Sequence, residues 1–146
     1  MFESSADNSI EILLVEDSPE DADLMARALK DGGLSIHVTV VEDGEEALCY
    51  LWRQGRFMTA VKPDLILLDL HLPRRTGHEV LNEIKQDELL RRIPIVIMTS
   101  VHDEQAIQTA YDLHANCCVA KPSDHAEFAL AVKKIEAFWR GVTQCL

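Results

Sequence analysis

The fold of this chain is decided by residues 65–73, which read Leu-Ile-Leu-Leu-Asp-Leu-His-Leu-Pro. A short unbroken apolar run bounded by turn-forming residues is typical of a parallel strand buried on both faces. Asp69 follows this run directly, at the carboxyl end of the predicted strand. In an open parallel sheet, ligands bind outside the carboxyl ends of the strands. We therefore expect the Asp69 carboxylate to face a ligand rather than the core.

Apolar and amphipathic segments alternate along the rest of the chain. The apolar segments predict strands at residues 10–15, 36–41, 64–68, 95–98 and 117–120. Helical spacing predicts helices that begin near Ser18-Pro19 and after Gly77, and helices over residues 45–54, 103–114 and 125–140. This alternation is typical of α/β folds. Right-handed crossovers then favour a doubly wound, flavodoxin-like parallel sheet with five strands in the order 2-1-3-4-5.

Composition and charge limit the classes of function. The 146 residues, 47% of them hydrophobic, fit one globular domain. A net charge of −11 argues against nucleic-acid binding, and no apolar stretch approaches the roughly 20 residues that span a bilayer. Residues 1–9 lack the basic and apolar regions of a secretion signal. We therefore expect a cytoplasmic protein with a flexible tail over residues 1–9, and a single domain over residues 10–146 with no output domain.

Polar side chains gather where the predicted strands end. Glu16 and Asp17 follow the first strand, Asp69 the third, Thr99 the fourth and Lys121 the fifth. Three close carboxylates need a compensating cation, and hard oxygen ligands suit Mg²⁺, whose coordination phosphate oxygens typically complete. A lysine and a hydroxyl can bind the same phosphate, and a carboxylate can attack phosphorus. The residues therefore predict a Mg²⁺-dependent site that forms an aspartyl phosphate on Asp69.

This set of motifs resembles the receiver domain of two-component response regulators. In that family an acidic pair follows the first strand, and the phosphoacceptor after the third strand is followed by Pro four residues later and Gly eight residues later. A Thr or Ser ends the fourth strand and a Lys-Pro pair ends the fifth. The matching residues in this chain are Glu16-Asp17, Asp69, Pro73, Gly77, Thr99 and Lys121-Pro122.

The resemblance implies a role for each residue of the metal and phosphate site. Asp69 would accept a phosphoryl group from a histidine kinase. Asp17 and Asp69 would ligate Mg²⁺ directly, with Glu16 nearby, often through water. The backbone carbonyl of His71 would be the remaining protein ligand. The implied chemistry is self-phosphotransfer and autodephosphorylation, so the resemblance implies a switch rather than an enzyme.

The resemblance also implies a switching mechanism, from which this chain departs at one position. Thr99 would bind the phosphoryl group and move toward it, Lys121 would pair with a phosphoryl oxygen, and the bond before Pro122 would be cis. Receivers usually carry Tyr or Phe three residues before the lysine, where this chain has Cys118. Because a thiol is much smaller than an aromatic ring, the usual coupling between the threonine and the aromatic side chain is in doubt.

A finer resemblance concerns three short segments. Residues 53–57, 113–117 and 135–139 read RQGRF, LHANC and IEAFW. They are similar to stand-alone regulators that serve phytochrome-type histidine kinases in cyanobacteria. This similarity implies a light-signalling kinase as partner, an unknown downstream protein, and a homodimer through the region of the C-terminal helix.

Three alternatives remain open beside the switch. A phosphatase with an aspartate nucleophile usually has a second Asp two residues later, where this chain has His71. A nucleotide binder needs a Gly-, Ser- or Thr-rich loop after the first strand, whereas residues 16–20 are acidic. The third alternative is a constitutive protein-docking module, in which Cys118 has weakened the switching. Equal partner affinity with and without phosphate would favour this last alternative.

Overall fold

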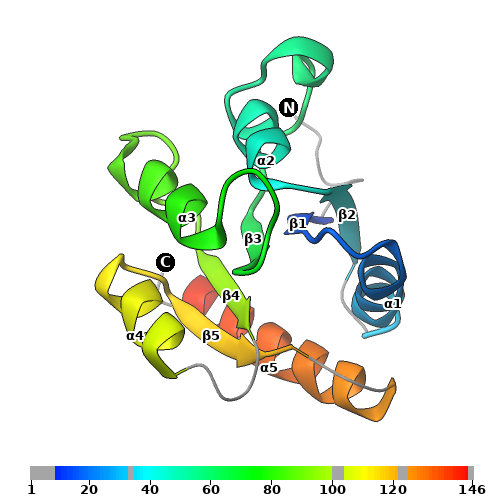
Figure 1. Cartoon of the computed structure of the whole chain (residues 1–146). Coiled ribbons are helices and arrows are strands. Elements are labelled where there is room, and N and C mark those ends of the chain that lie inside the picture. Colours follow the sequence, from blue (N-terminus) through cyan, green and yellow to red (C-terminus); the bar gives the residue numbers. More distant parts are fainter. Residues whose placement is uncertain (1–8, 33–34, 100–103, 122–124, 145–146) are drawn as a thin grey trace.

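A computed structural model describes residues 9–32, 35–99, 104–121 and 125–144 of the chain. Strands and helices alternate along the described residues (Figure 1). The strands are β1 (Ile10–Val15), β2 (Ile36–Val41), β3 (Leu65–Asp69), β4 (Ile95–Thr99) and β5 (Cys117–Ala120). The helices are α1 (Pro19–Lys30), α2 (Gly44–Leu51), the short 3-10 helix η2 (Gly55–Phe57), α3 (Gly77–Gln86), α4 (Glu104–Asp112) and α5 (His125–Gln144).

The strands form one parallel sheet in the order β2-β1-β3-β4-β5, which confirms the predicted topology. β3 lies at the centre, between β1 and β4 (Figure 1). All five of its side chains are buried, as expected for a central strand covered on both faces. Its last residue, Asp69, therefore emerges in the middle of the carboxyl edge of the sheet.

Two apolar clusters cover the two faces of the sheet. Because side chains alternate along a strand, Ile66 and Leu68 pack on one face of β3, and Leu65 and Leu67 on the other. The first cluster joins the sheet to α2, α3 and α4, and the second joins it to α1 and α5. Burial on both faces fixes the strand register, because a slip of one residue would exchange the two sets of side chains.

Side-chain caps start the helices that surround the carboxyl edge. The Ser18 hydroxyl accepts the Asp21 N–H at the start of α1, and Asp43 accepts the Glu46 N–H at the start of α2. Thr76 and Glu79 form a reciprocal capping box at the start of α3. These caps begin the helices directly after the loops that carry the polar residues, and so hold those loops close to the sheet.

The helix predicted over residues 45–54 is wrong at its end. α2 stops at Leu51, and the backbone N–H groups of Trp52 and Arg53 donate to the Leu48 and Tyr50 carbonyls. Arg53 then adopts a left-handed backbone conformation with a φ of 54°, which turns the chain away from the helix axis. The other differences are small, since β3 includes Asp69 and α5 extends to Gln144.

Further sequence-based expectations concern the N-terminal tail, membrane-spanning helices and the number of domains. The predicted tail lies outside the described residues except for Ser9, which precedes β1. Among the described residues, no helix combines the length and the apolar character needed to cross a membrane. The prediction of a single domain over residues 10–146 stays a prediction.

Candidate functional site: an acidic centre at the carboxyl edge

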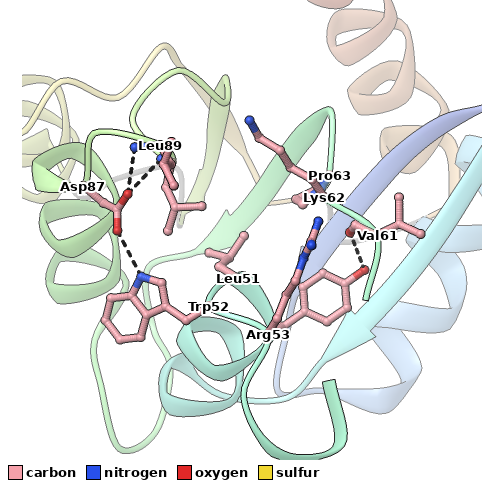
Figure 2. A pocket seen from close by; sticks show the side chains of 10 residues that line it. Leu51, Trp52, Arg53, Val61, Lys62, Pro63, Asp87 and Leu89 are labelled. Atoms are coloured by element: carbon pink, nitrogen blue, oxygen red, sulfur yellow. Dashed lines mark hydrogen bonds between the residues drawn. The ribbon is translucent and has the colours of Figure 1, made fainter. Parts of the chain in front are cut away.

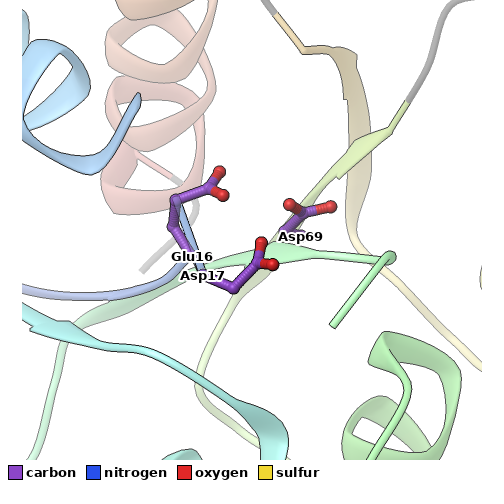
Figure 3. Close-up of side chains that lie close together, drawn as sticks. All are labelled: Glu16, Asp17 and Asp69. Atoms are coloured by element: carbon purple, nitrogen blue, oxygen red, sulfur yellow. The ribbon is translucent and has the colours of Figure 1, made fainter. Parts of the chain in front are cut away.

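Three carboxyl groups face one another where β1 and β3 end (Figure 3). Glu16 and Asp17 directly follow β1, and Asp69 ends β3. One oxygen from each of the three lies within 4.8 Å of the others. Glu16 and Asp69 are buried, with exposed fractions of 3% and 1%, whereas Asp17 is exposed. The strand order thus produces the predicted convergence of acids, with one of them open to solvent.

Lys121 is the cation that contacts this acidic centre. Its Nζ lies 3.0 Å from Asp69 Oδ2 and 3.0 Å from Glu16 Oε1. A third carboxylate, that of Asp21 in α1, lies 3.4 Å away. The lysine follows β5 directly, and its backbone N–H donates to the Thr99 carbonyl at 2.8 Å. Asp21 was not among the predicted site residues, although its position one helical turn after Asp17 indicates the same side of the helix.

Burial and the contacts with Lys121 shift the pKa values of this centre. Burial raises the pKa of Glu16 to about 7, although the Ser18 N–H and Lys121 both act in the opposite direction. The nearby charge of Asp69 raises it further. Burial alone would lower the pKa of Lys121, but its hydrogen bonds to Asp69 and Glu16 raise that pKa above its ordinary value. Lys121 is therefore charged throughout the physiological range.

Asp69 is held in one orientation by groups on both of its oxygens. Oδ2 accepts from Lys121 at 3.0 Å, and Oδ1 accepts the backbone N–H of His71 at 3.0 Å. The backbone of His71 thus lies beside the carboxylate, in the loop where the sequence analysis expected a metal ligand. Because the orientation of this carboxylate is already fixed, a reaction would have to remove little further conformational freedom.

Thr99 brings a hydroxyl to the same edge. It ends β4 with an exposed fraction of 1%, and its Oγ1 makes no hydrogen bond to the described residues. A buried polar atom without a partner costs free energy, so it is often explained by a ligand or water that it awaits. The neighbouring segment 100–103 lies outside the described residues. The predicted cis bond also lies outside them, because Pro122 is not described.

The start of α3 lies against the backbone of Asp69. A Cβ atom added to Gly77 would lie 2.6 Å from the Asp69 carbonyl oxygen and 2.5 Å from Leu70 Cα. The Gly77 N–H donates to the Leu70 carbonyl at 3.0 Å. The glycine eight residues after Asp69 therefore has a steric reason, since only glycine lets the helix approach this closely.

Cys118 has a neighbour that the sequence analysis missed. The hydroxyl of Tyr111, in α4, lies within hydrogen-bonding reach of the Cys118 thiol in β5. Burial raises the pKa of Cys118, although the Tyr111 hydroxyl acts in the opposite direction. Tyr111 remains 46% exposed. An aromatic side chain is thus present at this position of the sheet, but it comes from a helix, and no periodicity in the sequence relates the two residues.

The donor set fits a divalent cation. All three clustered side chains offer carboxylate oxygens, which hard cations such as Mg²⁺ and Mn²⁺ prefer. The acids outnumber the single nearby lysine, and an exposed Asp17 gives an ion access from solvent. Glu16, Asp17 and Asp69 together could therefore hold a divalent ion.

Known proteins share this arrangement over almost the whole chain. Residues 12–133 match the family model described as response regulator receiver domain. The response regulator Rcp1 of Synechocystis sp. is 41% identical over 128 residues, which cover 88% of this chain and 87% of Rcp1. Such coverage of both chains shows that the similarity extends beyond the site to the complete fold.

Solved structures agree with the sequence comparison. The phosphorylated cyanobacterial phytochrome response regulator RcpA superposes with a TM-score of 0.85 at 42% identity, covering 92% of this chain and 96% of RcpA. The Mn²⁺-bound form of Rcp1 gives a TM-score of 0.82 at 41% identity, covering 89% of this chain and 94% of that structure. A buried aspartate between an acidic pair and a lysine, on this fold and with these relatives, leads to one conclusion: the chain belongs to the response regulator receiver family of two-component systems.

Proposed function

We propose that this protein is a phosphoacceptor response regulator, in which Asp69 takes a phosphoryl group from a histidine kinase. One observation carries the proposal. The Asp69 carboxylate is 1% exposed, is held by Lys121 at 3.0 Å, and shares its space with two other acids. A structural acid would need only the lysine, whereas an excess of carboxylates at one edge of the sheet suits a site that binds a cation and an anion together.

The transfer step follows from the orientation of Asp69. Its carboxylate attacks phosphorus, an O–P bond forms, the P–N bond to the kinase histidine breaks, and the electron pair of that bond remains on the imidazole. Lys121 pairs with the charge that gathers on the phosphoryl oxygens. The Thr99 hydroxyl, which has no partner among the described residues, donates to one of these oxygens. Both groups act mainly by electrostatic stabilisation.

Mg²⁺ is the proposed resident cation. Asp17 and Asp69 would ligate it directly, Glu16 would lie near it, and the backbone carbonyl of His71 would complete the protein ligands. When bound, the ion neutralises charge on the phosphoryl oxygens. The Mn²⁺-bound form of Rcp1 supports a divalent site in a relative of this chain.

The relatives support a partner and a pathway. RcpA is named as a cyanobacterial phytochrome response regulator, so we propose a phytochrome-type histidine kinase as phosphodonor. We also propose a cytoplasmic location. We also propose that phosphorylation changes the affinity for an unknown downstream protein, and that two copies pair through the region of α5. Apart from self-phosphotransfer and autodephosphorylation, we propose no enzymatic activity.

Cys118 favours a second candidate, the constitutive docking module. Without a β5 aromatic side chain, Thr99 has a weaker means of changing the surface of α4 and β5. Tyr111 supports the switch instead, because its hydroxyl, which comes from α4, interacts with the Cys118 thiol. A partner that binds the phosphorylated and unphosphorylated forms equally would decide for the docking module.

The experiment that tests the proposed function is intact-mass measurement after incubation with Mg²⁺ and a small phosphodonor. Wild type should gain one phosphoryl group, and Asp69→Asn should gain none. Asp112→Asn is the matched control, since Asp112 is an exposed aspartate at the end of α4, and it should behave as wild type. Failure of wild type to gain a phosphoryl group both here and with a matched histidine kinase would overturn the proposal.

A further inference from the structure

A hollow opens at the amino edge of the sheet, on the side away from Asp69. Its walls come from the end of α2, the loop before β3 and the loop before β4 (Figure 2). Its volume of about 360 Å³ lies within the range of ligand-binding pockets in proteins. None of its lining residues belongs to the acidic centre, so the proposed phosphotransfer leaves it unexplained.

Hydrogen bonds hold both walls of the hollow to α2. On one side, Asp87 Oδ2 accepts from Trp52 Nε1 at 3.2 Å, while Oδ1 accepts the Leu89 and Leu90 N–H groups at 2.8 and 3.1 Å. On the other side, the Tyr50 hydroxyl donates to the Val61 carbonyl at 3.1 Å. The walls are therefore fixed before any ligand arrives, which lowers the entropic cost of binding.

Most of the side chains that line the hollow are apolar. Leu51 and Leu90 are buried at its base. Trp52, Val61 and Leu89 line its rim with exposed fractions of 39%, 57% and 76%. Large apolar side chains that gather around a concave surface are typical of a binding site, whereas single exposed ones need no explanation.

Two cations stand on the rim of this apolar surface. Figure 2 shows Arg53 and Lys62 on the side of Val61, opposite Trp52 and Asp87. Both are exposed, and neither forms an ion pair with another described residue. The acid in the lining, Asp87, is already engaged by three donors. In a chain with a net charge of −11, the rim thus offers uncompensated positive charge beside an apolar hollow.

The end of α2 fixes where Arg53 lies. Its φ of 54° lies in the left-handed region, which non-glycine residues rarely adopt. Arg53 is the left-handed residue of a Schellman motif that ends α2, in which the Arg53 and Gln54 N–H groups donate to the Tyr50 and Cys49 carbonyls at 3.1 and 2.9 Å. Here the conformation places an arginine at the end of α2, beside the hollow.

We propose that this hollow docks an acidic peptide segment of a partner protein, which inserts one large apolar side chain between Trp52 and Val61. The apolar side chain fills the hollow, while flanking carboxylates pair with Arg53 and Lys62. Docking in the hollow and phosphotransfer at Asp69 can take place at the same time, because they use opposite edges of the sheet. β3 separates the two edges by roughly 16 Å at about 3.3 Å per residue, so a docked partner leaves Asp69 accessible.

The test uses the fluorescence of Trp52 in a Trp139→Phe background, because the chain contains two tryptophans. The probes are three capped hexapeptides: Asp-Glu-Phe-Leu-Asp-Glu, its counterpart with four lysines in place of the acids, and its counterpart with two serines in place of Phe-Leu. The acidic apolar peptide should bind saturably, with a dissociation constant on the order of 10–100 µM for so small an interface. The other two should bind at least about fivefold more weakly.

Variants assign the binding to the hollow. Leu89→Ser and the double variant Arg53→Glu, Lys62→Glu should each weaken binding of the acidic peptide about fivefold or more. Met58→Ser and Arg27→Glu are matched controls, since Met58 is 71% exposed without lining the hollow and Arg27 lies in α1. All variants should still gain one phosphoryl group on Asp69, so a failure here is distinct from a failure of the proposed function.

Several results would overturn the proposal. Equal binding of the acidic and basic peptides would remove the role of the two cations. Absence of saturable binding up to about 1 mM would exclude affinity better than the millimolar range. A third contrary result would be co-sedimentation with phosphatidylserine vesicles, lost in the double variant, without peptide binding, because the rim would then recognise a lipid surface.

Discussion

The two edges of the sheet use charge in opposite ways. At the carboxyl edge, Glu16 and Asp69 are buried with Lys121 between them. At the amino edge, apolar side chains form a hollow and the cations Arg53 and Lys62 remain in solvent. Buried charges have strong interactions and shifted pKa values, whereas exposed charges are screened by water and salt. This difference fits the proposed phosphotransfer at the carboxyl edge and the proposed docking at the amino edge.

The largest expected effect comes from removing the buried cation. Lys121→Met leaves Glu16 and Asp69 without their partner, which we expect to lower the free energy of unfolding by about 3 kcal/mol in metal-free buffer. Lys62→Met, at the other edge, should change it by less than about 0.5 kcal/mol. Urea unfolding in the presence of EDTA measures both. If both variants lowered the free energy of unfolding by similar amounts, the proposed difference between the two edges would be wrong.

The second effect is a pH dependence that belongs to one edge. Because the folded-state pKa of Glu16 is raised from 4.5 to about 7, its contribution to stability is full below pH 4.5 and is lost as pH rises through 7. Metal-free wild type should lose roughly 2 kcal/mol more than Glu16→Gln between pH 5 and pH 8, on a scale of about 1.4 kcal/mol per pKa unit. Parallel stability profiles for the two proteins would contradict this assignment.

At the amino edge the sign of the pH dependence is reversed. The backbone N–H groups of Leu89 and Leu90, with Trp52, hold the pKa of Asp87 below its ordinary value. Its contribution is therefore present above about pH 4 and is lost as pH falls through the lowered value. Asp87→Asn, compared with wild type between pH 2 and pH 5, isolates this contribution.

The third effect concerns a close contact rather than a charge. Gly77→Ala pushes a Cβ atom into the backbone of Asp69 and Leu70, and we expect a loss of about 2 kcal/mol. Gly141→Ala is the matched control, because a Cβ atom there has nothing within 4 Å and alanine favours a helix by up to about 1 kcal/mol. Thermal unfolding distinguishes the two, and a neutral Gly77→Ala would show that the carboxyl edge can relax.

The smallest effect is loss of the hydrogen bonds that hold the hollow. Asp87→Ala removes the acceptor of three donors, and we expect a loss of about 1 kcal/mol. The fluorescence of Trp52 should move toward that of a solvated indole. Asp87→Asn keeps an acceptor oxygen and should retain most of both properties. An unchanged Trp52 signal in the alanine variant would mean that packing alone holds this wall.

The carboxyl edge could be predicted from the sequence because it depends on strand ends. Apolar runs locate the strands, the βα alternation orders them, and the residue after each run must then lie at one edge. Glu16, Asp69 and Lys121 meet for this reason alone, although they are far apart in the chain.

The amino edge could not be predicted in the same way. The bond between Trp52 and Asp87 joins residues 35 positions apart, and neither follows a periodic pattern. The early end of α2 depends on the backbone of Arg53, which no propensity indicates. The contact between Tyr111 and Cys118 also joins a helix to a strand through side chains alone. Such contacts arise from tertiary packing, which overrides local preference.

The contact at Gly77 has a mechanical consequence. Side chains absorb small displacements by changing rotamers, but a backbone that rests on a backbone has no rotamer to change. Gly77, the first residue of α3, has no side chain to separate the helix from the backbone of Asp69 and Leu70, and its N–H donates to the Leu70 carbonyl at 3.0 Å. A displacement of the Asp69 backbone would therefore pass directly to the first turn of α3, and the helix would move together with the aspartate.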